Sequence, residues 1–271
     1  KAAGQPVYNL LGGQVHEKLR SYTYIYARPE DKVNVYQDPD LSAERAAEIV
    51  AQGFTAVKFD PAGPYTAFDG RHLSLEAMDL CERFCRQLRE AVGGKADLLF
   101  GTHGQMTAAG AIRLARRLEK YDPLWFEEPV PPDAPEEMAK VARGTTIPIA
   151  AGERLTTKYD FGRMLAAGSA AILQMNLGRV GGILEAKKIA GMAEVSHVQI
   201  APHLYCGPVV GAAAFLAAGY RVPLAAITFV AETTGRAGFI APAMLAAFAA
   251  DITIGRASVS GEQRDDAEAG W

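Results

Sequence analysis

Short apolar runs alternate with longer amphipathic segments along most of this chain, and no other feature limits the possible fold as strongly. The expected strands are 21–26, 55–59, 97–101, 124–126, 147–151, 171–175, 198–201 and 226–230. Helical periodicity predicts helices at 41–52, 74–92, 107–119, 135–141, 157–166, 181–195 and 207–220. Alternating strand and helix is typical of a parallel α/β sheet. Because no strand leads into a glycine-rich dinucleotide turn, the eight strands favour a TIM-type (β/α) barrel over a doubly wound sheet.

Three helix starts carry residues that commonly cap helices. Ser42, Ser74 and Thr107 stand at or near the beginning of the helices expected at 41–52, 74–92 and 107–119. Serine and threonine side chains accept hydrogen bonds from the unpaired amides of a first helical turn. We therefore expect Ser42 and Ser74 as N-caps, and we expect Thr107 to open the third of these helices.

Composition and charge exclude several classes of protein. The 271 residues are 49% hydrophobic and 22% charged, with a net charge of −3, which is typical of a globular chain without a basic surface for nucleic acid. The uncharged run 204–220 contains Pro208 and is 17 residues long, so we expect a buried helix and no membrane span. No charged segment followed by an apolar leader is visible, and three cysteines without metal spacing fit a reduced compartment. We expect a cytoplasmic protein.

Polar residues follow five consecutive expected strands. They are Glu127, Glu153, Asn176, His203 and Glu232, separated by 26, 23, 27 and 29 residues, or about one strand–helix unit each. In a barrel the carboxyl ends of all strands meet at one rim, where barrel enzymes hold their catalytic groups. Residues far apart in the sequence should therefore become neighbours there.

Two of these residues suggest a cation. Glu127 and Glu153 follow neighbouring strands, and a pair of carboxylates can hold a hard divalent ion such as Mg²⁺. Glu128 should point to the other face of its strand, because side chains alternate along a strand. A surface ion network is the alternative interpretation of the pair.

Several motifs in fixed order carry a resemblance to a known family. They are Val7-Tyr-Asn-Leu-Leu-Gly-Gly13, Val57-Lys-Phe-Asp60, Trp125-Phe-Glu-Glu-Pro129, Ala151-Gly-Glu153, Ile172-Leu-Gln-Met-Asn-Leu-Gly-Arg-Val-Gly-Gly182, Lys188-Ile-Ala-Gly-Met-Ala-Glu194 and Ala201-Pro-His203. From about residue 7 to residue 213 the chain resembles the enolase superfamily, in its mandelate racemase/muconate lactonizing enzyme branch, and within it the acid-sugar dehydratases. The resemblance implies a (β/α)7β barrel without the N-terminal α+β capping domain of that family.

The same resemblance implies the metal ligands. Glu127 and Glu153 match two of three ligands of a Mg²⁺ ion, while Gly101 stands where the family has an aspartate. His103 lies two residues further on and would favour Mn²⁺ or Zn²⁺ if it reached the ion.

The proton-transfer roles also follow from the resemblance. His203 matches the family's base on the seventh strand, and Asn176 replaces the aspartate that is the usual partner of that base. We expect Asn176 to accept the ring N–H of His203 without raising the imidazole pKa as a carboxylate would. In the dehydratases a histidine at the position of His103 is the acid that expels a hydroxyl group.

Three further residues complete the expected site. Lys58 could neutralise a substrate carboxylate, and Asp60 occupies the place of the second lysine that racemases use as a base. The missing lysine favours elimination on one face over two-base racemisation. Glu232 fits a carboxylate on the eighth strand that hydrogen-bonds the substrate.

The resemblance therefore implies a Mg²⁺-dependent dehydratase, a lyase of carbohydrate acid metabolism that takes the α-proton of a sugar acid and eliminates the β-hydroxyl through an enolate. Within the family, a lactone cycloisomerase or a racemase/epimerase is the alternative. Outside it, a barrel hydrolase using Glu127 and Glu153, or a non-catalytic or truncated relative, remains open. The expected partners are a small-molecule sugar acid and further copies of the chain in a homo-oligomer, with no nucleic acid and no membrane.

The expected domain organisation has three parts. Residues 1–20 are interpreted as a remnant of the linker from a capping domain, residues 21–235 as the catalytic barrel, and residues 236–271 as a C-terminal helix, 242–250, with a tail.

Overall fold

A curled parallel sheet forms the centre of the computed structural model, which describes residues 4–61 and 73–203. Its seven strands follow one another in sequence order, and each pairs in parallel with the next. They are β1 (Thr23–Tyr24), β2 (Ala56–Phe59), β3 (Asp97–Gly101), β4 (Trp125–Glu127), β5 (Ile149–Ala151), β6 (Ile172–Leu173) and β7 (Gln199–Ile200). A doubly wound sheet would reverse its strand order, so the predicted barrel-type α/β fold is confirmed.

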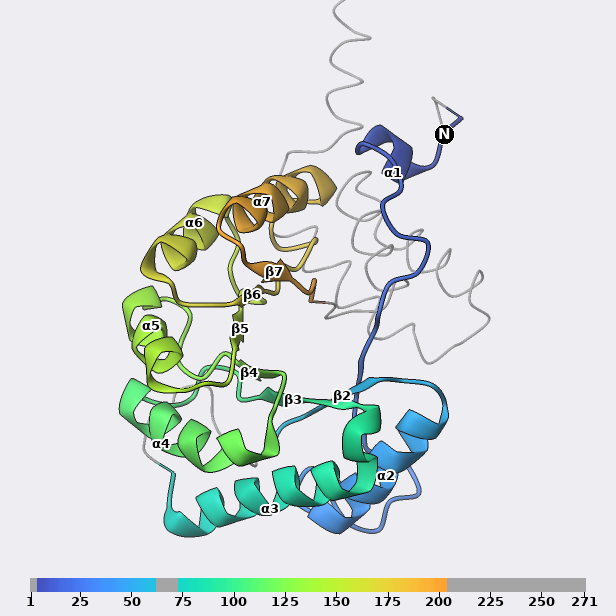
Figure 1. Cartoon of the computed structure of the whole chain (residues 1–271), viewed down its shortest axis with the longest axis vertical. Coiled ribbons are helices and arrows are strands. Elements are labelled where there is room, and N and C mark those ends of the chain that lie inside the picture. The colour runs from blue at the N-terminus through green and yellow to red at the C-terminus, as the bar shows by residue number, and fades with distance from the viewer. Residues whose placement is uncertain (1–3, 62–72, 204–271) are drawn as a thin grey trace, which may run out of the picture.

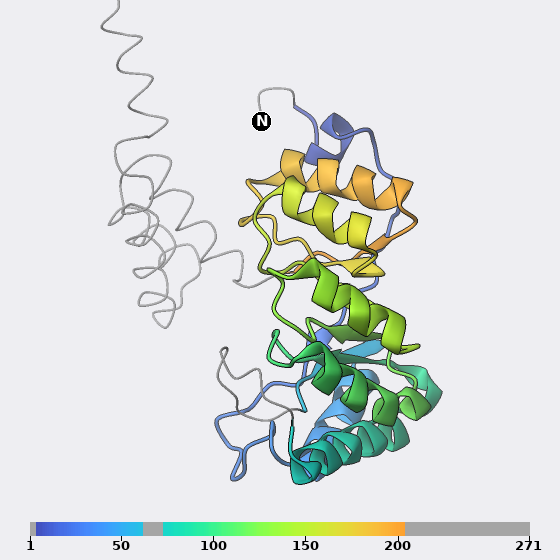
Figure 2. The same ribbon diagram turned by 90° about the vertical axis from the view of Figure 1, so that its left-hand side faces the viewer.

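Helices cover the outer, convex face of this sheet, as Figures 1 and 2 show from two sides. They are α2 (Pro39–Ala51), α3 (Leu75–Val92), α4 (Ala108–Leu118), α5 (Pro135–Gly144), α6 (Lys158–Ala167) and α7 (Ile183–Val195). Each agrees with its predicted range to within a few residues. The strand expected at 226–230 and the helices expected at 207–220 and 242–250 lie outside the described residues, as does Glu232.

Of the two predicted helix caps, Ser74 is confirmed and Ser42 is wrong, and Thr107 opens its helix as an N-cap. Ser74 accepts from the amide of Ala77, and Thr107 accepts from the amide of Gly110. Helix α2, however, begins before Ser42, because Asp38 caps it and a proline occupies its first position. Proline is well suited to the first position of a helix, where its missing N–H would have no partner anyway. The Ser42 hydroxyl instead donates to the carbonyl of Val35 at 2.6 Å.

Apolar side chains lie on both faces of the sheet. The larger cluster fills the space between strands and helices and includes Phe84, Phe100, Phe126 and Phe161, all buried. A smaller cluster lies on the inner face of the strands and is composed of Ala56, Leu99, Trp125, Ala150 and Ile172. Because side chains alternate along a strand, this inner cluster identifies which positions point into the barrel.

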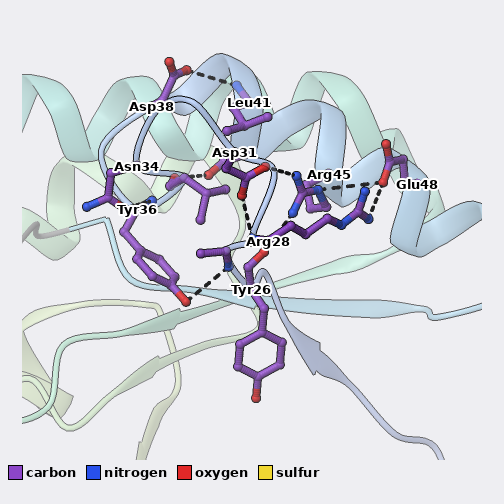
Figure 3. Close-up of polar contacts among 12 residues, drawn as sticks. Tyr26, Arg28, Asp31, Asn34, Tyr36, Asp38, Leu41, Arg45 and Glu48 are labelled. Atoms are coloured by element: carbon purple, nitrogen blue, oxygen red, sulfur yellow. Dashed lines mark hydrogen bonds and ion pairs between the residues drawn. The ribbon is translucent and has the colours of Figure 1, made fainter.

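The loop between β1 and α2 is held by a polar network (Figure 3). The buried Arg45 guanidinium pairs with Asp31 at 2.8 Å and donates to the carbonyl of Tyr26 at 2.9 Å. The Asn34 side chain accepts from the amide of Tyr36 at 3.0 Å, which forms a turn near the surface. This network fixes the path of the chain just after the first strand.

The N-terminal segment runs along the side of the sheet. Helix α1 (Val7–Leu10) lies near α7, and the chain then passes to β1 beside β2 (Figure 1). The Lys187 ammonium of α7 donates to the carbonyl of Leu11 and so connects α7 to the segment that follows α1. Among the described helices, none has both the length and the apolar character needed to cross a membrane.

Candidate functional site

Four strand positions lie one step beyond the inner apolar cluster, and two of them, Lys58 and Glu127, were predicted as polar site residues. Lys58 follows Ala56, Gly101 follows Leu99, Glu127 follows Trp125 and Gln174 follows Ile172, each two residues further along its strand. Two residues bring a strand back to the same face. The strand pattern therefore places these groups at the carboxyl end of the sheet and on its inner side.

Lys58 and Glu127 form a buried ion pair at this end. Both residues are at most 5% exposed, and the Lys58 ammonium contacts Oε1 of Glu127. The other carboxylate oxygen accepts from the Gln174 amide at 2.6 Å. Burial is the largest single effect and lowers the pKa of Lys58, but the charge and hydrogen bond of Glu127, together with Tyr22 and Glu153, raise it by more, so that the pKa lies above its ordinary value and the ammonium stays charged.

Gly101 makes this contact possible. It lies on β3, between Lys58 on β2 and Glu127 on β4, and is paired with Glu127 in the sheet. A Cβ atom at position 101 would stand 3.3 Å from Cε of Lys58. The missing side chain therefore leaves the lysine room to reach across one strand.

His203 is held between Asn176 and Glu153. Its Nδ1 lies 3.1 Å from the Asn176 amide nitrogen, and its Nε2 lies 3.4 Å from a carboxylate oxygen of Glu153. Burial lowers the pKa of His203, and the Glu153 carboxylate opposes that effect.

The orientation of the Asn176 amide corrects one expectation. Its oxygen already accepts from the backbone amides of Gly178 and Arg179, at 3.0 and 3.2 Å. Turning the amide over would point its NH₂ group at two other donors, so the NH₂ group must face His203. Asn176 therefore donates to Nδ1 of His203 and does not accept the ring N–H as predicted.

His103 and Asp60 form a second pair, at the ends of β3 and β2. Nδ1 of His103 lies 3.1 Å from a carboxylate oxygen of Asp60. This hydrogen bond is the main cause of a raised pKa of His103; burial lowers the pKa, the charges of Asp60 and Glu153 raise it further, and Lys58 lowers it. The His103 backbone has a φ of +51°, a left-handed conformation that is uncommon for a residue with a side chain and often marks functional sites.

The backbone around His103 is anchored to β4. The Thr102 hydroxyl contacts the backbone carbonyls of Glu127 and Glu128, at 3.1 and 3.0 Å. The Gly104 amide also donates to the backbone carbonyl of Glu128, at 2.6 Å. Glu128 is fully buried and accepts from Arg154 at 2.7 Å, and burial raises the Glu128 pKa to about 7. These contacts join the ends of β3, β4 and β5.

Most of the predicted residues are thus brought together. Lys58, Glu127, Glu153 and His203 form one cluster, and Glu153 acts electrostatically on both His103 and His203. The sequence analysis missed Gln174 and Arg154. The position of Gln174 two residues before Asn176 could have indicated it, because both point to the same face. Nothing in the sequence pattern singled out Arg154.

Glu127 and Glu153 are the carboxylates available to a divalent cation, but Lys58 and Gln174 already contact both oxygens of Glu127. Glu127 and Glu153 are 2% and 8% exposed and come from neighbouring strands. Mg²⁺ often takes one or two carboxylates and completes its shell with water and substrate oxygens. Within residues 4–61 and 73–203, no group of three or more His, Cys, Asp or Glu side chains is arranged to hold a metal ion. Gly101 supplies no third ligand.

Comparison with known sequences identifies a family. Residues 41–253 match the family described as enolase C-terminal domain-like. D-galactonate dehydratase of Klebsiella pneumoniae (strain 342) is 36% identical over 220 residues, covering 79% of this chain and 52% of that protein. D-galactonate dehydratase of Ralstonia nicotianae is 38% identical over 214 residues, covering 79% and 52%. The chain thus spans about half the length of these relatives.

Solved structures show the same relationship. A protein from Burkholderia SAR-1, assigned provisionally to the mandelate racemase/muconate lactonizing enzymes, is 68% identical with a TM-score of 0.75, covering 78% of this chain and 52% of that one. A mandelate racemase/muconate lactonizing enzyme-like protein from Roseovarius sp. TM1035 is 57% identical with a TM-score of 0.74, covering 76% and 52%.

Proposed function

The chain belongs to the enolase superfamily, in the C-terminal domain family of the mandelate racemase/muconate lactonizing enzymes, and on this premise we propose that it acts on a sugar acid. The proposed reaction removes the proton α to the carboxylate and eliminates the β-hydroxyl as water. The first product is an enol, which becomes a 2-keto-3-deoxy acid. The names of the D-galactonate dehydratases that it resembles support this substrate class.

The observation that carries the proposal is the convergence of a buried cation, two carboxylates and two histidines at one end of the sheet. Lys58 on β2 pairs with Glu127 on β4, and His203 after β7 pairs with Glu153 after β5, and the two pairs act on each other electrostatically. An α-proton beside a carboxylate is very weakly acidic, so positive charge near that carboxylate and a positioned proton acceptor are both required. The cluster offers both.

Each residue has a proposed task. Lys58 carries the positive charge nearest to the substrate carboxylate, and Gln174 and Lys58 together hold Glu127 in place. His103 and His203 are the groups able to move or share protons near neutral pH. Asp60 stands where a racemase would have a second lysine base, which supports elimination over racemisation.

The family is typically Mg²⁺-dependent, and we propose that Glu127 and Glu153 hold this ion. A bound cation would supply further positive charge for the carboxylate of the substrate. Mn²⁺ would fit the same oxygen ligands.

Restoring the third carboxylate should strengthen metal binding. We expect Gly101→Asp to lower the dissociation constant for Mn²⁺ by about tenfold or more, because ligand charge sets the affinity of such sites. A Cβ atom at position 101 would stand 3.3 Å from Cε of Lys58, so the lysine must shift by a few tenths of an ångström to admit the carboxylate. Titration calorimetry would measure the affinity, with Gly101→Asn as the uncharged control. Equal affinity in the Asp variant and the original chain would contradict the two-carboxylate site.

Isotope exchange tests the proposed reaction. The chain would be incubated with Mg²⁺ in D₂O and a panel of aldonates and aldarates that includes D-galactonate. We expect deuterium at Cα of at least one substrate and formation of its 2-keto-3-deoxy product. If no acid sugar exchanges or is dehydrated, either by this chain or by a longer protein that contains it, the proposed function is wrong.

A further inference from the structure

His103 and His203 have hydrogen-bond partners of opposite kinds. Asp60 can only accept a hydrogen bond when it is ionised, whereas the Asn176 group that faces His203 can only donate one. The nitrogen of a neutral imidazole that carries the proton is set by the hydrogen bond at the other nitrogen. The two contacts therefore fix two different tautomers.

The neutral form of His103 carries its proton on Nδ1. The Asp60 carboxylate lies 3.1 Å from this nitrogen and requires a donor there. The lone pair is then on Nε2, on the far side of the ring from Asp60. A histidine with this arrangement is able to accept a proton at Nε2 and to keep the resulting charge next to a carboxylate.

The neutral form of His203 carries its proton on Nε2. Asn176 donates to Nδ1, so that Nδ1 must hold the lone pair. Nε2 lies 3.4 Å from a carboxylate oxygen of Glu153. In this tautomer Nε2 of His203 has no lone pair with which to take a proton.

From these contacts we propose that His103, positioned by Asp60, both removes the α-proton and returns it to the departing hydroxyl, and that His203 is a neutral hydrogen-bond donor. This inference rests on the proposed function and changes the roles that the family resemblance implies. Asn176 and Asp60 are positioning residues, because they act through the two imidazole rings.

The proposed step balances. Nε2 of His103 takes the α-proton, and the electrons of the C–H bond pass into the enolate. The enolate electrons then form the Cα–Cβ double bond as the bond to the β-hydroxyl breaks. The His103 imidazolium gives its proton to the leaving oxygen, which departs as water, and the ring returns to its neutral state. His203 donates a hydrogen bond to developing negative charge without giving up its proton, as a neutral histidine electrophile can.

The surroundings of His103 support this role. The hydrogen bond to Asp60 and the charges of Asp60 and Glu153 raise the pKa of His103, while burial and Lys58 lower it. A proton acceptor is most effective when its pKa lies near the working pH.

Nitrogen NMR of the imidazole rings tests the tautomers without any substrate. The chain has five histidines, and single substitutions would assign their signals. At a pH where the rings are neutral, we expect Nδ1–H for His103 and Nε2–H for His203. Asn176→Asp should convert His203 to the Nδ1–H form, because a carboxylate accepts. Asn34→Asp, at a turn of the β1–α2 loop without a histidine, is the matched control and should change neither signal (Figure 3).

Exchange of the α-proton tests the roles. We expect Asp60→Asn to slow exchange by about a hundredfold or more, and an Asp60→Asn, His103→Asn double variant to be no slower than His103→Asn alone.

The outcomes separate the two proposals. A His203 ring that carries its proton on Nδ1 in the unchanged chain would overturn the inference, as would full exchange activity in Asp60→Asn. The expected tautomers together with no exchange of any acid sugar would support the hydrogen-bond assignment and reject the proposed function.

Discussion

Replacing His103 with asparagine is expected to lower kcat/KM for dehydration by about 10²- to 10⁴-fold, the range over which general acid–base groups contribute. Asparagine is chosen because position 103 has a φ of +51°, and asparagine tolerates this region better than most residues. The loss should appear in kcat, because His103 is proposed to act on the reacting atoms and not to bind the substrate carboxylate. His203→Gln should lower kcat/KM by less than about a hundredfold, because glutamine retains an N–H donor.

The pH dependence of the unchanged chain follows from the same assignment. His103 must be neutral to take the α-proton, and its pKa lies above the ordinary value because Asp60 holds the protonated form. The rate should therefore rise with pH through that raised pKa and level off above it. Asp60→Asn removes the carboxylate, so the rising limb should move to lower pH while its plateau falls.

Steady-state kinetics with a substrate found by isotope exchange would measure these effects. His197→Asn is a matched control, because His197 is another histidine with a positive φ, at +55°, and lies just after α7 away from the site. It should leave kcat/KM unchanged. A larger loss in His203→Gln than in His103→Asn would return the role of base to His203.

The sequence was sufficient for the fold and for the clustering of several candidate site residues at one end of the sheet. Alternation of strand and helix gave the order of the seven described strands, and the regular spacing of Glu127, Glu153, Asn176 and His203 correctly brought them to one end of the sheet. Both inferences need only the regular repeat of strand and helix along the chain and the parallel arrangement of the strands. The start of α2 was missed because Ser42 was expected as its N-cap. Asp38 caps the helix instead, and Pro39 is its first residue.

The sequence did not predict the directions and partners of individual hydrogen bonds, because nearby donors and acceptors compete for the same group. Asn176 was expected to accept from His203, and only the backbone of Gly178 and Arg179, which occupies its oxygen, reverses that direction. The pairing of Asp60 with His103 requires a left-handed backbone at His103, held in turn by contacts to Glu128. Such details depend on the orientation of single groups and leave no periodic pattern in the sequence.

Replacing Lys58 with methionine is expected to reduce the free energy of unfolding by about 3–5 kcal/mol, the usual result of removing one partner from a buried ion pair. Methionine matches the length of the lysine side chain but brings no charge. Glu127 is 2% exposed and would keep only the Gln174 amide as a partner. Urea unfolding would measure the change, with Lys140→Met as the control, because the Lys140–Glu137 pair is exposed and such pairs contribute at most about 1 kcal/mol.

A double variant shows why this pair is present. In Lys58→Met, Glu127→Gln the buried charges disappear together, and the glutamine can still share a hydrogen bond with Gln174. We expect most of the lost stability to return, because desolvating two charges offsets much of their attraction. If the double variant is as stable as the original chain but inactive, the pair serves substrate binding and not folding. If instead the double variant is less stable than Lys58→Met alone, Glu127 is held mainly by contacts other than Lys58, and the account of the buried pair given above is wrong.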